Sequence, residues 1–169
     1  MAASKFLALV SGRIREVIAT VTSTGVSDDG KIVALGTDGR LDASVMPVGI
    51  GAEVKSIQAS ENLSASNLVN IWNSAGQFRV RKADATTAGK EANGFVLSAV
   101  TSGQNALVYL EGSITGLGGL TPGRYYLSTT PGEATLTPPT GAGNVVQYIG
   151  DALSTTEITF ERTEGVILA

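Results

Sequence analysis

The sequence predicts an all-β protein, an antiparallel β-sandwich or small β-barrel preceded by a small N-terminal module of a β-hairpin and turns. From residue 53 onward, short apolar runs alternate with Gly, Pro, Asn and Asp at spacings of about 8 to 15 residues, which is typical of consecutive strands. No long helical period intervenes. The segment 93–128 is the clearest case, because its apolar runs at 95–100, 107–110 and 124–127 are each too short for an ordinary helix.

The central strand of the fold is predicted at residues 107–111. Val108 and Leu110 alternate with Leu107 and Tyr109, so both faces of this strand are apolar and we expect it to be covered on both sides. A short connection containing Gly103 precedes it, which favours an antiparallel hairpin with residues 95–100.

At the N-terminus, residues 5–10 and 13–17 are rich in apolar and β-branched side chains and flank the turn pair Ser11-Gly12. This pattern predicts a β-hairpin. A single amphipathic helix over residues 4–21 is the alternative. Gly12 in its middle and the β-branched run at 17–21 favour the hairpin.

Residues 27–52 read as turns and short elements. Ser27-Asp-Asp-Gly30 predicts a turn, residues 31–35 a short strand, and residues 41–46 a single helical turn that ends before Pro47. Two glycines within residues 48–52, Gly49 and Gly51, interrupt any regular element there. We therefore expect a boundary at this point, between an N-terminal anchoring or trimerisation module (1–50) and an antiparallel β-domain (53–169).

Further strands are predicted at residues 53–58, 68–72, 77–83, 134–137, 144–149 and 156–161. In the third of these, Phe78 and Val80 alternate with Arg79 and Arg81. Together with Lys82 these arginines predict a charged, solvated face or a protected edge strand. A dedicated anion site is the alternative.

The composition argues against most catalytic chemistry. The chain has no Cys and no His, which excludes disulfides, thiolate nucleophiles, the usual zinc ligands and the usual general base. Asp28, Asp29, Asp38 and Asp42 sit in turn sequences and lack the spacing of a calcium loop. We expect no catalytic residue, no metal and no cofactor. A small depolymerase would need a pair of carboxylates. Asp and Glu total 15, but no spacing in the sequence singles out such a pair.

Charge and hydropathy also limit the partners. A net charge of −3 argues against nucleic acid, and the longest N-terminal apolar run, residues 6–10, is too short for a signal peptide or a membrane span. Charged residues make up only 16% of the chain, and the mean hydropathy is +0.18. This apolar excess indicates surface buried against other chains. The residues predicted to make capsid or trimer contacts are Phe6, Leu7, Leu9, Val10, Ile14, Val17, Ile18, Val45 and Met46.

Two parts of the sequence resemble a known class. The stretch from Asp29 to Pro47, DGKIVALGTDGRLDASVMP, followed by VGIG, resembles a module of tailed-phage virion proteins such as head fibres, capsid decoration proteins and tail fibres. Segments 83–90, 94–97, 120–128, 145–150 and 157–160 are similar to a β-domain that accompanies it.

This resemblance implies a structural protein of the virion. It implies a homotrimer that binds the major capsid protein and stands on the capsid surface, with host cytoplasm as its location during assembly and no catalytic residues to carry over. The alternative is a tail-fibre or receptor-binding virion protein with a host-surface glycan as its ligand, and a small depolymerase is the third hypothesis.

Overall fold

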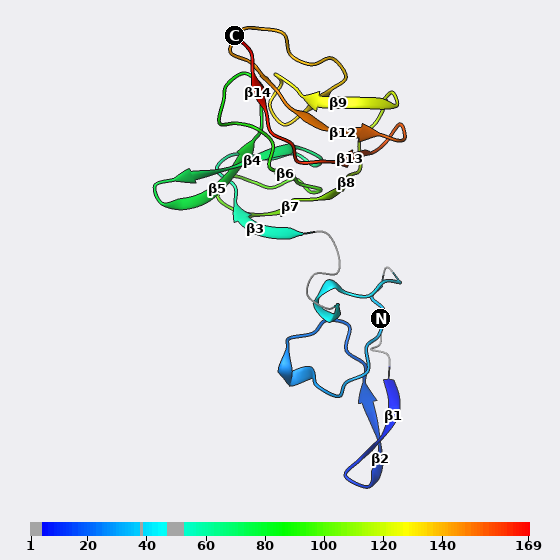
Figure 1. Cartoon of the computed structure of the whole chain (residues 1–169). Helices are drawn as coiled ribbons and strands as arrows, with labels where there is room; N and C mark the ends of the chain where they lie inside the picture. The colour runs from blue at the N-terminus through cyan, green and yellow to red at the C-terminus, as the bar shows by residue number, and fades with distance from the viewer. Residues whose placement is uncertain (1–4, 38, 47–52) are drawn as a thin grey trace. The chain divides into compact units, whose positions relative to one another are not determined.

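The computed structural model describes residues 5–37, 39–46 and 53–169. The chain divides into two units, residues 1–51 and 52–169, and each is described by itself. Antiparallel sheets dominate the described residues (Figure 1), whose helical pieces are 3-10 turns, so the predicted all-β class is confirmed. Asp38 and the junction predicted at Gly49 and Gly51 lie outside the described residues.

A hairpin begins the N-terminal unit. Strand β1 (Lys5–Val10) pairs in antiparallel register with β2 (Arg13–Ile18), which confirms the predicted hairpin against the single helix. Ser11 and Gly12 between them have φ values of 51° and 75°. Two successive positive φ angles fit a type I′ turn, whose twist matches that of the flanking strands.

The rest of this unit is built of turns. The 3-10 turn η1 spans Val26–Asp28, and η2 spans Ala43–Val45, where the sequence predicts a helical turn. The strand predicted at residues 31–35 is wrong. Val33 makes only an isolated parallel bridge with Thr20, just beyond the end of β2, so the segment lacks the continuous partner that would extend it into a strand.

Two five-stranded sheets and a small third sheet form the second unit. The first sheet has the order β3 (Val54–Gln58), β7 (Asn105–Tyr109), β6 (Gly94–Phe95), β4 (Leu68–Ser74) and β5 (Gln77–Lys82). The second sheet has the order β10 (Ala134–Thr135), β9 (Gly123–Leu127), β12 (Tyr148–Ala152), β13 (Ile158–Phe160) and β8 (Gly112–Ile114). Strands β11 (Val145–Val146) and β14 (Val166–Ile167) pair with each other.

The larger hydrophobic cluster joins the two five-stranded sheets as in a sandwich. Leu68 and Phe95 enter it from the first sheet, and Ile149 and Phe160 enter it from the second. The Phe95 ring stacks on Tyr109 at 5.4 Å between centroids and meets Phe160 edge-on at 5.5 Å. Such aromatic pairs stabilise a core beyond the area they bury.

A second cluster covers the other face of the first sheet. It contains Val69, Val80 and Val108, and the strand neighbours Leu68 and Tyr109 face the larger cluster because side chains alternate. The prediction that the strand around Val108 is covered on both faces is confirmed for Val108 and Tyr109. It is wrong for Leu107, which is 53% exposed, because this residue lies opposite Ser56 on the outermost strand.

Two predicted strands are corrected. The strand expected at 95–100 leaves the sheet after Phe95, where Val96 turns into the second cluster, and Val100 makes only an isolated bridge with Leu63. The strand expected at 144–149 is divided at Gln147 into β11 and β12, which belong to different sheets. The sequence analysis missed β8 and β14, which are only three and two residues long.

Candidate contact surface of the N-terminal unit

The register of the first hairpin separates its side chains into two faces. Cross-strand partners share a face, and alternate residues along each strand share it too. One face, here called the apolar face, carries Lys5, Leu7, Leu9, Ile14, Glu16 and Ile18. The opposite face carries Phe6, Ala8, Val10, Arg13, Arg15 and Val17.

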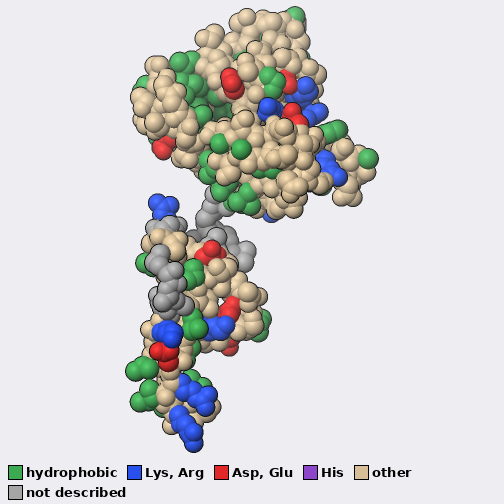
Figure 2. Space-filling view, turned by 180° about the vertical axis from the view of Figure 1, so that it is seen from behind, with side chains coloured by type: hydrophobic (Ala, Val, Ile, Leu, Met, Phe, Trp, Pro, Cys, Tyr) green, Lys and Arg blue, Asp and Glu red, His purple; other side chains and the backbone are tan. Residues whose placement is uncertain are grey.

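The aliphatic side chains of the apolar face are open to solvent. Leu7, Leu9 and Ile14 are each 74% exposed, and Ile18 is 57% exposed. Figure 2 shows hydrophobic side chains lying open on this unit, with Lys and Arg side chains beside them. Aliphatic side chains that lie singly on a surface are ordinary, but four of them on one face of a short hairpin form a patch typical of a contact surface.

An ion pair crosses the apolar face. Lys5 Nζ lies 2.5 Å from Glu16 Oε1, diagonally across the hairpin, and both side chains are exposed. A pair of this kind stabilises a hairpin by about 0–1 kcal/mol. It neutralises the charges that interrupt the patch, so the face as a whole presents apolar surface without net charge.

Exposure continues through the remainder of the unit. No side chain described at 5–37, 39–42 and 44–46 is buried. Val26 is 94% exposed, Leu35 58% and Ile32 52%, and these residues were not among the predicted contacts. Ile32 and Leu35 lie in the segment predicted as a short strand, and Val26 directly precedes a predicted turn, so no pattern in the sequence marked these three residues as exposed.

Hydrogen bonds of Asp28 hold the loop that presents Val26. Asp28 Oδ1 accepts from Lys31 Nζ, and Oδ2 accepts from the main-chain N–H and the hydroxyl of Thr24. These bonds, that of Lys31 first, lower the pKa of Asp28 from 3.8 to about 2. The aspartate thus acts as a fixed acceptor for the loop, which is turn chemistry and not metal ligation.

The predicted contacts Val45 and Met46 lie outside the hairpin strands, at the end of η2 and directly after it. Asp42 Oδ1 accepts from the main-chain N–H of Ser44 at 2.9 Å and from its hydroxyl at 2.6 Å. The hydroxyl bond, followed by the main-chain bond, lowers the pKa of Asp42. Val45 is half-buried and Met46 is 37% exposed.

The structure therefore divides the predicted contact residues into three groups. Leu7, Leu9, Ile14 and Ile18 share the apolar face, Phe6, Val10 and Val17 share the opposite face, and Val45 and Met46 lie at the end of η2 and directly after it. Only the first group forms a strongly exposed aliphatic patch, since Phe6 and Val17 are half-buried.

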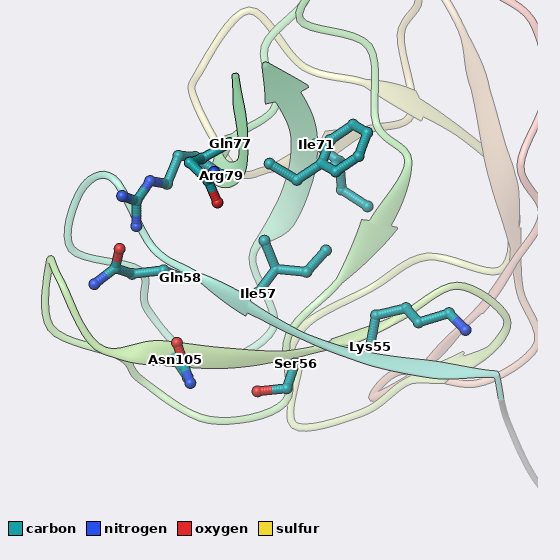
Figure 3. Close-up of a pocket in the computed structure, with 9 residues that line it drawn as sticks. Lys55, Ser56, Ile57, Gln58, Ile71, Gln77, Arg79 and Asn105 are labelled. Atoms are coloured by element: carbon teal, nitrogen blue, oxygen red, sulfur yellow. The ribbon is translucent and has the colours of Figure 1, made fainter. Parts of the chain in front are cut away.

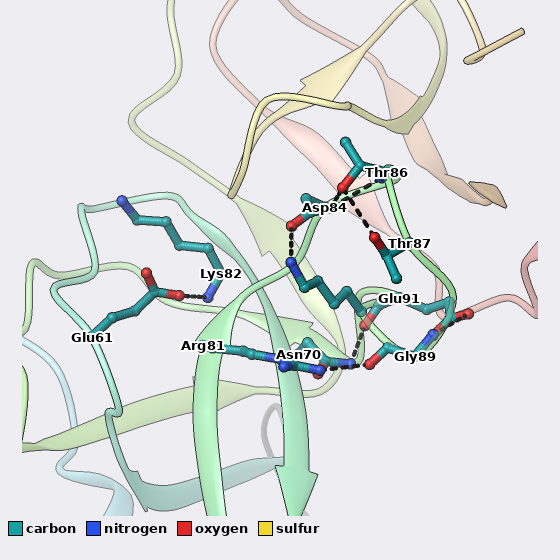
Figure 4. A network of polar contacts seen from close by, with 10 residues as sticks. Glu61, Asn70, Arg81, Lys82, Asp84, Thr86, Thr87, Gly89 and Glu91 are labelled. Carbon is teal, nitrogen blue, oxygen red and sulfur yellow. Dashed lines mark hydrogen bonds and ion pairs between the residues drawn. The ribbon is translucent and has the colours of Figure 1, made fainter. Parts of the chain in front are cut away.

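Polar groups of the second unit are mostly engaged within it. Arg81 donates from Nε to Asn70 Oδ1 at 3.0 Å and from Nη2 to the Gly89 carbonyl at 2.8 Å (Figure 4). It also lies 4.7 Å from the Trp72 ring centre. The prediction of a solvated face is therefore wrong for Arg81. Lys82 points to the other face of β5, because it lies one position further along the strand.

Asp84 fixes the loop that follows β5. Burial raises its pKa, but hydrogen bonds from Thr86 and from Lys90 Nζ, at 3.0 Å, outweigh burial, so the pKa is lowered overall. Figure 4 shows these groups converging on one carboxylate. Within the described ranges, no three His, Cys, Asp or Glu side chains gather where they could hold a metal ion.

The fold and this surface define a class: an all-β protein whose N-terminal hairpin presents an unpartnered apolar face. No family model and no curated protein matches the chain. Among solved structures, it is similar to the head fibre gp8.5 N base of bacteriophage phi29, with a TM-score of 0.43 and 16% identity over 68% of this chain and 98% of that one. In the described part of the chain, no helix has the length and apolar character needed to cross a membrane.

Proposed function

We propose that the chain is a structural virion protein that binds the capsid surface of a tailed bacteriophage as a homotrimer, in the role of a capsid decoration or head-fibre protein. The observation that carries the proposal is the N-terminal unit, in which no side chain described at 5–37, 39–42 and 44–46 is buried and one face of the hairpin carries four exposed aliphatic side chains. The resemblance of residues 29–47 to a module of phage virion proteins indicates that the assembly in which this unit binds is a phage virion.

The energetics favour apolar contact. Burying an aliphatic side chain stabilises a contact by about 1.5–3 kcal/mol, whereas an exposed ion pair adds about 0–1 kcal/mol. The apolar face offers Leu7, Leu9, Ile14 and Ile18, against the single pair of Lys5 with Glu16. Aliphatic burial therefore outweighs charge in any interface made here.

Association of several copies of the chain would also bury these exposed aliphatic side chains. A module of about 50 residues buries too little of its own surface to be stable alone, and association with other copies supplies the missing core. Three copies of the hairpin, with their apolar faces turned to a common axis, enclose these aliphatic side chains together. The capsid then meets the remaining exposed residues of the unit, such as Val26 and Leu35.

The test uses purified full chain and phage capsids that lack it. We expect trimers in sedimentation and saturable capsid binding for the unaltered chain. Leu9→Asp and Ile14→Asp, which charge a cross-strand pair on the apolar face, are expected to abolish trimerisation or attachment.

Val10→Asp is the matched control, because it places the same charge one residue away on the opposite face, where Val10 is 38% exposed. We expect it to retain trimers and binding. A stable monomer at micromolar concentration that still binds capsids would contradict the trimer. If all three variants lost trimerisation or capsid binding equally, the apolar face would not be the surface responsible.

A further inference from the structure

The two outer strands of the first sheet, β3 and β5, come together at one end. Ala59 and Val80 form a parallel bridge, and the main-chain N–H and hydroxyl of Ser60 donate to the Val80 carbonyl at 2.8 Å and 3.0 Å. The sheet thus curls around the second hydrophobic cluster. It closes into a barrel-like shape at this end.

At the other end the two strands separate. Residues 55–58 of β3 and 77–79 of β5 are not paired with each other, and a cleft of about 720 Å³ lies between them (Figure 3). We call this cleft the strand slot. Because both walls are strand edges, its geometry is that of a sheet from which one strand is missing.

Main-chain groups point into the strand slot from both walls. Ala59 N–H donates to Gln104 next to β7, so alternation turns the main-chain groups of Ser56 and the N–H of Gln58 away from β7 and into the slot. On β5, the Val80 carbonyl faces Ser60. The same alternation turns the N–H and C=O of Phe78 into the slot.

The side chains around the strand slot differ between its two faces. On the inner face Ile57 and Ile71 continue the second hydrophobic cluster, and Phe78, on the same face as Val80, remains 72% exposed. On the outer face lie polar side chains that Figure 3 shows gathered together, namely Gln58, Gln77, Arg79 and Asn105. A β-strand has this two-faced character, since its side chains alternate.

The charge of the strand slot is positive. Arg79 has no ion-pair partner among the described residues, and Lys55 on the inner wall pairs only with Glu53, at 3.6 Å between two exposed side chains. An entering segment that carries carboxylates on its outer face would meet Arg79. Apolar side chains on its inner face would cover Phe78 and Ile71.

We propose that the strand slot binds an extended segment of a partner protein, about four or five residues long, in which apolar and acidic residues alternate. The segment adds a strand between β3 and β5, as in other cases of strand addition to a sheet edge. Its main chain bonds to Ser56, Gln58 and Phe78, and its carboxylates lie beside Arg79. An acidic saccharide fits the polar rim but leaves the main-chain groups of both walls without partners.

The test measures binding of a blocked hexapeptide of alternating glutamate and valine to the full chain by calorimetry. The control peptide has three glutamates followed by three valines. We expect the alternating peptide to bind at least about tenfold more tightly, since only it matches both faces. Equal affinity of the two peptides, or no binding of either, would overturn the proposal.

Two variants separate main-chain pairing from general attraction. Ser56→Pro removes an N–H that points into the slot without removing a bond to β7, whereas Ser56→Ala keeps it. We expect about tenfold weaker binding for the proline variant alone. If that variant does not fold, N-methylation of alternate peptide residues removes donors from the other side, and undiminished binding would refute strand addition.

Hydrogen exchange and charge provide independent measures. The amides of Ser56, Gln58 and Phe78 are expected to exchange quickly in the free chain and to be protected by the peptide. Arg79→Glu is expected to reverse the preference, so that a lysine-valine peptide binds and the glutamate peptide does not. Binding of an acidic oligosaccharide without protection of these amides would assign the cleft to sugars instead. None of these measurements depends on capsid binding, so their outcome is independent of the proposed function.

Discussion

Residue 150 is a glycine, and its lack of a side chain lets strands β12 and β13 of the second sheet approach each other closely. Gly150 has a φ of +148°, and a Cβ placed there would lie 1.8 Å from the Thr159 carbonyl oxygen. Other side chains would have to displace the main chain of β13, which pairs with β12 at this point. The glycine is required both by its own conformation and by its neighbour.

Gly150→Ala is accordingly expected to lower the free energy of unfolding by at least about 2 kcal/mol, from backbone strain and displacement of β13. Urea denaturation of the full chain measures it. Gly118→Ala is the control, because its Cβ meets nothing within 4 Å and its φ is not positive, so a change within about 0.5 kcal/mol is expected. Similar losses in both would show that the strand contact is not the cause.

The pKa of Asp28 makes a second prediction at this scale. Because the folded chain lowers it from 3.8 to about 2, the ionised form is favoured by the fold. The contribution of Asp28 to the loop is then complete above pH 3.8 and is lost as the pH falls through about 2. We expect the amide resonance of Thr24 to shift over this range in an NMR titration, and not to do so in Asp28→Asn. A midpoint near 3.8 would contradict the hydrogen-bonded carboxylate.

Among the elements, the first hairpin was the most predictable, since its signals are local, whereas the segments expected to form a hairpin at 95–100 and 107–111 pair only between Phe95 and Tyr109, across the long connection 96–104. Ser11-Gly12 predicts the first turn because Gly accepts a positive φ and Ser is small and polar. The strands predicted at 68–72 and 77–83 leave residues 73–76 between them, but β4 extends to Ser74, β5 begins at Gln77, and only Ala75 and Gly76 between them have positive φ. Nothing in the sequence shows that an alanine accepts φ of 51° in that turn.

The very short strands could not be predicted for a different reason. Strands such as β6 and β14 are two residues long, and they belong to a sheet only because they pair with a strand far away in the chain. Gly94 illustrates this, because its Cβ position lies 2.4 Å from the Tyr109 carbonyl oxygen. That close approach is a property of the packed fold and leaves no periodic pattern in the sequence.

Gln147, between β11 and β12, links three segments through its buried amide. Its Oε1 accepts from Ala92 N–H at 2.7 Å, and its Nε2 donates to the carbonyls of Ala92 at 2.9 Å and Thr163 at 2.8 Å. Gln147→Leu keeps the volume and leaves these main-chain groups without partners. Since each unpaired buried group costs about 1–3 kcal/mol, we expect a loss of about 3 kcal/mol or more in thermal or urea unfolding.

Gln104→Leu serves as the matched control for that substitution. Gln104 is exposed and its side chain makes no hydrogen bond within the described residues, so the same chemical change is expected to alter stability by less than about 0.5 kcal/mol. If Gln147→Leu were equally mild, the three segments would be held by packing and not by the amide.

For the whole molecule, alternation predicts which residues of the hairpin share a face but not which face a partner covers. Alternation places the neighbours Leu9 and Val10 on opposite faces, but only the structure shows that Leu9 is 74% and Val10 38% exposed. The strand slot could not be predicted at all. It depends on the curl that brings Ala59 to Val80, which no local pattern around either residue indicates.

Salt provides a test of the proposed assembly as a whole. At about 1 M salt the screening length shortens to about 3 Å, which weakens exposed pairs such as Lys5 with Glu16 and leaves apolar burial intact. We expect trimers and capsid attachment to persist at that concentration in sedimentation. Release of the protein by salt, together with retention in Leu9→Asp, would mean that attachment is electrostatic and lies elsewhere.

The last prediction concerns the independence of the second unit. Among the described residues, the members of both hydrophobic clusters lie between Ile57 and Phe160, outside the N-terminal unit. A fragment of residues 53–169 is therefore expected to fold alone, with a β-type circular dichroism spectrum and one cooperative unfolding transition. We expect it to be monomeric and to bind no capsids, because it lacks the apolar face, yet to bind the alternating peptide as the full chain does. Capsid binding by this fragment would reverse the assignment of the anchor, and failure to fold would show that residues 1–51 complete its core.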